Sequence, residues 1–210
     1  MQPVVEQFMS DVESSKIESV EQFALLALGE IGSKVPLGET VVKHQLKQFS
    51  RASESVKMSA AIGIGLVTSG NLAQLIPLLL DTLSSSDSPQ ISYLTLVSIR
   101  EATKNASDDA LLPFAKDLFA RLQEYSGASE EGSRNVLAEC LGRLVSVEPS
   151  LCNILQVLLV SLKTVCLYFA RKNARAKTSE FAKLNLLLPK TSVTYNNSIS
   201  KPSSLFFQVN

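Results

Sequence analysis

The amino-acid sequence predicts an all-α fold, an α-solenoid of about four stacked helical hairpins, followed by an atypical C-terminal helix and a disordered tail. The first observation is an inner helix rich in apolar and small residues, whose four copies align at Leu28, Gly63, Ser98 and Leu141. The second is the spacing of these positions, which is 35, 35 and 43 residues. Repeats of about 35–45 residues with two helices each are typical of HEAT and armadillo solenoids. Such arrays present a surface to a partner, so the repeat indicates binding rather than chemistry.

Each hairpin is predicted from an apolar periodicity. The outer and inner helices are expected in turn at residues 2–13 and 18–33, 39–49 and 55–68, 71–82 and 89–105, and 108–124 and 130–146. In the first hairpin, the apolar positions of the two helices are Val4, Val5, Phe8 and Met9, then Phe23, Leu26, Ala27 and Ile31. We expect these two faces to pack in the core.

Small residues distinguish the second inner helix, where Gly63 and Gly65 lie in mid-helix. Glycine costs about 1 kcal/mol in a helix relative to alanine. Its repeated use predicts that adjacent inner helices approach closely here. The mid-helix position also excludes a dinucleotide-binding loop, which needs these glycines between a strand and a helix.

Helix-boundary residues support the third and fourth hairpins. Ser88 is the expected N-cap of an inner helix whose first residue is Pro89. Pro77 and Pro113 fall inside the two outer helices, where each removes one hydrogen bond. Asp108 and the following acid suit a helix N-terminus electrostatically.

The chain changes character after Pro149. We predict a solenoid over residues 1–150, an apolar helix over 151–172 that caps the array, and a basic, Ser/Asn-rich disordered tail over 173–210. The stretch Leu151–Ala170 is also long enough to span a membrane. Lys163 inside it would cost about 2.5–3.5 kcal/mol near the bilayer centre, so the packed helix is favoured.

Charge and cysteine usage restrict the partners. Residues 1–148 carry 12 Lys and Arg against 19 Asp and Glu, whereas residues 149–210 carry 8 against 1. Because phosphate binding needs clustered cations, the repeat region is not expected to bind nucleic acid. The start of the chain has no signal sequence and the three cysteines form no C-x-x-C pair. These features predict a reducing compartment, the cytoplasm or the nucleus.

No residue pattern predicts catalysis, a cofactor or a metal ion. The single histidine, His44, lies beside Lys43 and Lys47 on an outer helix, and we expect it to be exposed and structural. The cysteines lack the paired spacing of a zinc site. No serine has the glycine pattern of a nucleophile elbow. We therefore expect a protein that is not an enzyme and takes no small-molecule substrate.

The most specific motif is the fourth inner helix, EEGSRNVLAECLGRL at residues 130–144. It resembles a segment of the cullin-associated NEDD8-dissociated proteins, also called TBP-interacting proteins. ALLALGEIG at residues 24–32 and SGNLAQLIPL at residues 69–78 resemble the same family. Their order and spacing resemble the later part of that family's HEAT array, and the likeness ends near Cys152.

The resemblance implies a non-catalytic module of an exchange factor that binds unneddylated cullin–RING ligases and regulates adaptor and substrate-receptor exchange in SCF assembly. Four charged residues of the fourth hairpin are candidates for partner binding: Glu130, Glu131, Arg134 and Glu139. Alternatively they form a solvated helix face, with Arg134 and Arg143 linking neighbouring repeats by ion pairs.

Other interpretations stay open at this level. The chain could be a generic HEAT-repeat scaffold or adaptor with another protein partner, a protein tethered to a membrane by its apolar stretch, or a non-functional truncated product.

Overall fold

The computed structural model describes residues 2–127 and 130–151. Within them the chain forms α-helices and short 3-10 turns but no strand, so the predicted all-α fold is confirmed. The elements are α1 (Gln2–Ser14), α2 (Glu18–Lys34), α3 (Glu39–Leu46), η1 (Lys47–Ser50), α4 (Glu54–Ser69), α5 (Leu72–Ser85), α6 (Pro89–Asn105), α7 (Asp108–Gln123), α8 (Glu131–Val147) and η2 (Pro149–Leu151). Each of the helices predicted for the four hairpins over residues 2–146 is present, with boundaries that differ by only a few residues.

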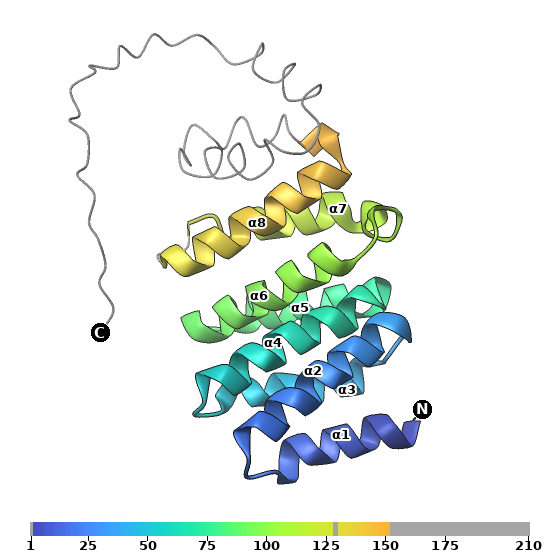
Figure 1. The fold of residues 1–210 in the computed structure, drawn as a ribbon. Helices are drawn as coiled ribbons and strands as arrows, with labels where there is room; N and C mark the ends of the chain where they lie inside the picture. The colour runs from blue at the N-terminus through green and yellow to red at the C-terminus, as the bar shows by residue number, and fades with distance from the viewer. Residues whose placement is uncertain (1, 128–129, 152–210) are drawn as a thin grey trace, which may run out of the picture. The chain divides into compact units, whose positions relative to one another are not determined.

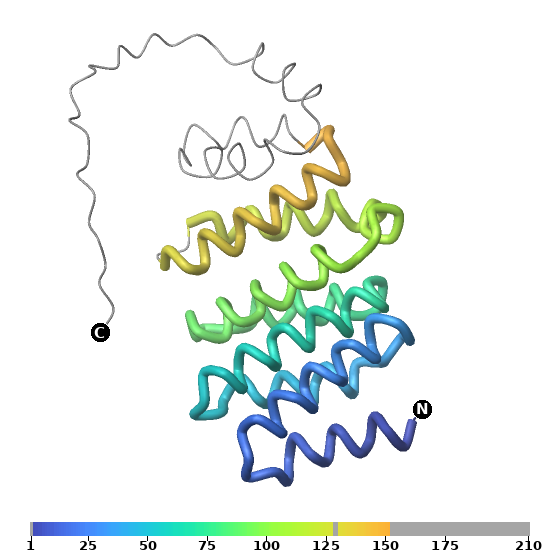
Figure 2. The backbone as a smooth tube through the Cα atoms, in the orientation of Figure 1, coloured from blue at the N-terminus to red at the C-terminus, as the bar shows by residue number. Residues whose placement is uncertain are grey.

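The helices form two layers within this array. The inner row consists of α2, α4, α6 and α8, and each of these packs on the next (Figure 1). The outer row, α3, α5 and α7, lies behind it, and α1 packs on α2 at one end (Figure 1). The backbone passes from an outer helix to an inner helix in each hairpin, then on to the next hairpin (Figure 2). This is the arrangement of a helical-hairpin solenoid.

Serine residues are the N-caps of three of the helices. Each accepts a hydrogen bond from the backbone N–H three residues later: Ser53 from Val56 (3.3 Å), Ser88 from Ile91 (3.5 Å) and Ser107 from Ala110 (3.3 Å). A serine oxygen in this position satisfies one of the unpaired N–H groups of a helix N-terminus. The predicted N-cap at Ser88 is confirmed, and Pro89 is the first residue of α6.

Glycines allow the inner helices to pack closely against one another. A Cβ built on Gly63 of α4 would lie 2.6 Å from the carbonyl oxygen of Leu25 in α2. A Cβ on Gly65 would lie 2.5 Å from the carbonyl oxygen of Ser98 in α6. A Cβ built on Gly29 of α2 would lie 2.9 Å from the α-carbon of Gly63. The predicted close approach of adjacent inner helices is therefore confirmed, and it uses both flanks of α4.

One part of the predicted core is wrong. Phe23 and Val4, expected in the core of the first hairpin, are 65% and 50% exposed. The buried face of α2 is formed instead by Ala24, Leu25 and Leu28. Apolar periodicity identified an apolar face of α2, but this face points away from α4, and α1, which packs on α2, leaves Phe23 largely exposed.

The predicted cap over residues 151–172, apart from Leu151, and the predicted tail over 173–210 lie outside the described residues. The described part of the chain contains no helix that combines the length and the apolar character needed to cross a lipid bilayer.

Candidate protein-binding surface

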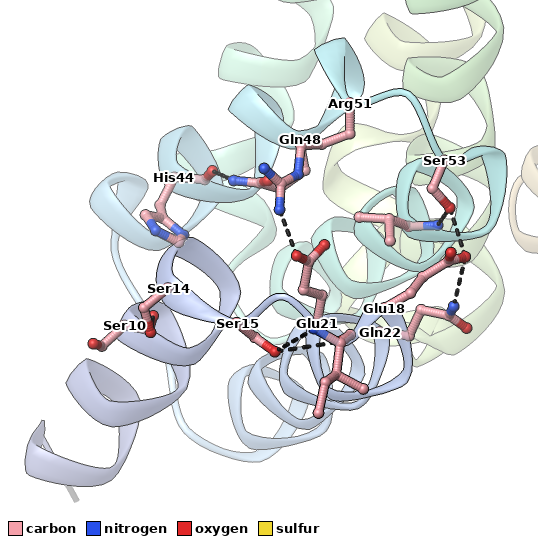
Figure 3. A network of polar contacts seen from close by, with 12 residues as sticks. Ser10, Ser14, Ser15, Glu18, Glu21, Gln22, His44, Gln48, Arg51 and Ser53 are labelled. Atoms are coloured by element: carbon pink, nitrogen blue, oxygen red, sulfur yellow. Dashed lines mark hydrogen bonds and ion pairs between the residues drawn. The ribbon is translucent and has the colours of Figure 1, made fainter.

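Polar side chains at the first turns of the inner helices join neighbouring hairpins. The carboxylate of Glu18 in α2 accepts hydrogen bonds from the Ser53 hydroxyl at 2.6 Å, from the Ser55 hydroxyl, and from Gln22 at 3.1 Å (Figure 3). The hydrogen bond from Ser53, followed by that from Ser55, lowers the pKa of Glu18 below its ordinary value. This carboxylate therefore links α2 to the start of α4.

A second link of the same kind joins α4 to α6. Glu54 accepts hydrogen bonds from Lys57 at 2.9 Å and from Gln90 of α6 at 3.1 Å. The hydrogen bond from Lys57 lowers the pKa of Glu54. Arg51, just before α4, pairs with Glu21 of α2 at 2.6 Å (Figure 3). The carboxylates at this edge of the inner row therefore already join neighbouring hairpins.

The last two hairpins are joined by Arg143 of α8. Its guanidinium donates to the carbonyl oxygens of Thr103 and Ala106, both at 3.1 Å, and to the carboxylate of Asp108 at 2.6 Å. The two carbonyls belong to the C-terminal end of α6, where backbone acceptors lack helical partners. Linking of neighbouring repeats by Arg143, predicted from the sequence, is confirmed.

The four residues proposed for partner binding lie in two places. Glu130 precedes α8 and Glu131 begins it, and both are exposed. Glu139 lies two turns further on, about 12 Å along the helix axis from Glu131. There its carboxylate is 3.7 Å from the guanidinium of Arg100 in α6, and it is partly buried. Arg134 is also partly buried. Only the pair at the start of α8 is therefore fully open to a partner.

Sequence reasoning missed an apolar stripe on the solvent side of α4, which we call the α4 stripe: Met58, Ile62 and Leu66. These residues follow one another at intervals of four, one helical turn, and are partly exposed. The rest of α4 packs on α2, α6, α3 and α5. Since α4 is apolar on every side, periodicity alone could not separate this stripe from the core. Small residues such as Gly63 and Gly65 mark the sides of α4 that pack on α2 and α6. Their positions are the sequence signal that could have separated the α4 stripe from the core.

Two side chains of types that can take part in chemistry, His44 and Cys140, are buried in the array. The expectation that His44 is exposed is wrong: it is 6% exposed, with its Nε2 atom 2.9 Å from the carboxylate of Glu13. The helix α3 turns His44 toward the first hairpin, while Lys43 and Lys47 face solvent. Cys140 is fully buried, and burial raises the pKa of its thiol to about 12. In the part of the chain that the structure describes, no three His, Cys, Asp or Glu side chains are grouped as metal ligands.

A helical array with an open inner row therefore offers a binding surface. No known protein-family profile matches the chain. Individual relatives do match it: it is 38% identical over 134 residues, 60% of the chain, to Cullin-associated NEDD8-dissociated protein 1 of Drosophila melanogaster. Over this stretch the chain is similar in sequence to the cullin-associated NEDD8-dissociated family.

Other members of the cullin-associated NEDD8-dissociated family give the same result. The mouse protein named Cullin-associated NEDD8-dissociated protein 2 is 37% identical over 135 residues, 62% of the chain. A relative from Emericella nidulans, named the C-terminal part of Cullin-associated NEDD8-dissociated protein 1, is 31% identical over 151 residues, 69% of the chain. The resemblance predicted from the sequence is confirmed. The matches cover 11%, 10% and 14% of the lengths of these three relatives, so the chain spans a small segment of each.

Proposed function

We propose that this chain is a non-catalytic HEAT-repeat module that binds the scaffold of a cullin–RING ligase lacking NEDD8, in the cytoplasm or the nucleus. The observation that carries the proposal is the similarity of its array to proteins named for their association with cullins and their dissociation from NEDD8. The cysteines of the sequence form no C-x-x-C pair, which agrees with a reducing compartment.

The inner row is the surface that we assign to this partner. The α4 stripe provides an apolar centre, which is the usual core of a protein interface. Glu130 and Glu131 at the start of α8 add exposed carboxylates, which suit a partner surface rich in Lys and Arg. Because a solenoid contacts its partner through several repeats at once, the affinity of four hairpins is expected to be modest.

The regulatory step belongs to the same proposal. An array that binds the unmodified scaffold competes with adaptors or substrate receptors if their sites overlap. We therefore propose that binding of this module shifts the exchange of adaptor and receptor in SCF assembly, as the resemblance implies. No chemical step by the module is needed, since exchange by competition requires only differential binding.

A binding assay with two forms of the ligase tests the proposal. The purified chain is titrated against an immobilised cullin–RING complex, once unmodified and once conjugated to NEDD8. We expect saturable binding in the micromolar range to the unmodified complex and weaker binding to the conjugated one. Absence of binding to the unmodified complex up to about 100 µM, an affinity weaker than about −5.5 kcal/mol, would contradict the proposal.

Surface variants locate the binding face. Ile62→Glu alters the α4 stripe, and the double variant Glu130→Gln with Glu131→Gln removes the carboxylates at α8. Lys47→Glu, exposed on η1 of the outer row, is the matched control. We expect the first two variants to weaken binding and the control to leave it unchanged, with helicity checked by circular dichroism. If only the control weakens binding, the outer row is the binding face.

A further inference from the structure

Two lines of side chains run next to each other on the solvent side of α2 and α4, which are neighbours in the inner row (Figure 1). At the first turns, the side-chain amide of Gln22 in α2 donates to the Ser55 hydroxyl of α4 at 3.3 Å. Further along, a Cβ built on Gly29 would lie 3.1 Å from the Cβ of Leu66. The two helices therefore run parallel, and residues at the same height can be matched between them.

The solvent-facing residues between these two contacts are apolar. On α2, Leu26 lies one turn after Gln22 and is partly exposed, whereas its neighbour Leu25 is fully buried. Because the Leu25 carbonyl oxygen is the atom nearest to a Cβ on Gly63, Leu26 lies at about the height of Ile62 in the α4 stripe. We call Leu26 together with the α4 stripe the α2–α4 patch.

Carboxylates lie at both ends of the α2–α4 patch. Glu18 and Glu54 are exposed in the first turns of α2 and α4. At the other end Glu30 is exposed one turn after Leu26, and it directly follows Gly29, which lies beside Leu66. Glu18 and Glu30 are therefore about 18 Å apart along the axis of α2, one at each end of the apolar residues.

Few cations offset these carboxylates, because α2 and α4 contain one basic residue each. Lys57 of α4 bonds to Glu54 at 2.9 Å, and its side chain is only 9% exposed. Lys34 is the last residue of α2. Among the described residues, neither Glu18 nor Glu30 forms an ion pair. Negative charge at both ends disfavours nucleic acid and anionic lipid, and it favours a protein partner with Lys or Arg at matching positions.

The backbone of this face restricts the occupant to a helix. The patch lies in the middle of α2 and α4, where N–H and C=O groups are paired within each helix. It therefore offers no backbone partner to an extended peptide, which binds by adding a strand to a sheet edge. It also has no aromatic side chain, whereas grooves for polyproline segments are lined by them. An amphipathic helix pairs its own backbone groups and packs its apolar stripe between two parallel helices.

We propose that the α2–α4 patch binds an amphipathic α-helix of the cullin–RING scaffold that carries Lys or Arg at both ends of its apolar stripe. This inference rests on the proposed function and names the segment of the partner that the site recognises. Apolar side chains of the helix, at intervals of three and four residues, pack on Ile62 and Leu66. Its two cationic ends, about twelve residues apart, pair with Glu18 and Glu30.

Two model peptides of about 20 residues test this recognition. Both are Ala-rich helices with Leu at intervals of three and four residues on one face. One carries Lys at both ends of this face, and the other carries Glu at the same positions. Each fluorescently labelled peptide is titrated with the full chain, and anisotropy reports binding. We expect saturable binding of the Lys peptide with a dissociation constant below about 1 mM, at least about tenfold tighter than that of the Glu peptide.

Variants of the chain locate the contact. Ile62→Glu places a charge within the patch and should weaken binding of the Lys peptide about tenfold or more. Leu112→Glu, a change of the same kind at an exposed apolar residue of α7, is the matched control and should leave the affinity unchanged. Glu30→Lys reverses the charge at one end, so it should weaken binding of the Lys peptide and strengthen binding of the Glu peptide. Circular dichroism establishes that each variant remains folded.

The outcomes separate this inference from the proposed function. No saturable binding of the Lys peptide, equal affinity for the two peptides, equal losses in Ile62→Glu and Leu112→Glu, or an unaltered peptide preference in Glu30→Lys would each overturn it. The unmodified cullin–RING complex should displace the Lys peptide. If the complex binds but the peptide does not, this inference alone is wrong. If the peptide binds but the complex does not, the proposed function is wrong, and so is the assignment of the helix to the cullin–RING scaffold.

Discussion

Gly63 lies where two backbones leave no room for a side chain. A methyl group there would come within 2.6 Å of the Leu25 carbonyl oxygen and 3.2 Å of the Gln45 amide, which itself donates to that oxygen at 3.2 Å. Because the carbonyl is part of α2, relief requires the two helices to separate. We expect Gly63→Ala to lower the free energy of unfolding by about 1–3 kcal/mol, although alanine favours helix formation.

Urea denaturation followed by circular dichroism measures this loss. Gly132→Ala is the matched control, because Gly132 also lies in a helix and its added Cβ would meet the Tyr93 ring at an ordinary 3.4 Å. We expect this control to be neutral or more stable by up to about 1 kcal/mol. Equal effects of the two variants would show that the close contact at Gly63 does not govern stability.

Arg143 is the second residue at which a substitution is expected to lower the free energy of unfolding strongly. Arg143→Met keeps most of the aliphatic stem but leaves the Thr103 and Ala106 carbonyls without their charged donor. We expect a loss of about 1–3 kcal/mol in unfolding free energy. Asp108→Asn removes only the ion pair to a side chain that is 70% exposed, and it should cost less than about 1 kcal/mol. Thermal or urea unfolding of both variants distinguishes the two contributions; the reverse order would contradict this account.

At the scale of helices, the Glu18 carboxylate makes the contact between the first two hairpins sensitive to pH. Hydrogen bonds from Ser53 and Ser55 lower its pKa in the folded state below the ordinary value of 4.5. A group with a depressed folded pKa stabilises the protein above its unfolded pKa, and this contribution is lost as the pH falls through the folded pKa. We therefore expect Glu18→Gln to be less stable than the native chain near pH 6, and this difference to shrink below about pH 4.5.

The measurement is the urea midpoint of both proteins between about pH 6 and pH 3. Glu30→Gln serves as the control, because the exposed Glu30 side chain has no polar contact among the described residues. A difference between Glu18→Gln and the native chain that stays constant across this range would show that the serine contacts do not set the charge state of this carboxylate.

The boundaries of the helices could be predicted because local chemistry sets them. Ser88 followed by Pro89, and the acidic start of α7, mark helix beginnings whatever the neighbours are. The exposure of particular faces could not be predicted, since it depends on which helix lies next to which. Phe23 and His44 show the two errors, an apolar residue left open at the end of the stack and a polar residue covered by α1. The α4 stripe was missed for the same reason.

At the scale of the whole array, each hairpin is stabilised mainly by its two neighbours. Among the described inner helices, α4 and α6 each pack between two other inner helices, whereas α2 packs on one inner helix, α4, and on α1. Stability in such an array is approximately a sum over hairpins and the contacts between adjacent hairpins. The exposed Phe23 and Val20 thus mark the hairpin that gains the smallest contribution from stacking.

Hydrogen exchange of the native chain tests this gradient. Local opening of a hairpin with one neighbour breaks one stacking interface, whereas opening of an interior hairpin breaks two. Amides of α4 and α6 should therefore exchange about tenfold or more slowly than those of α1 and α2 under native conditions. Gly63→Ala weakens the contact between α2 and α4, so it should speed exchange in α1 and α2 more than in α6. Equal amide protection across α1 to α6, in both the native chain and Gly63→Ala, would contradict this account. It would mean that the array opens as one cooperative unit rather than from its α1–α2 end.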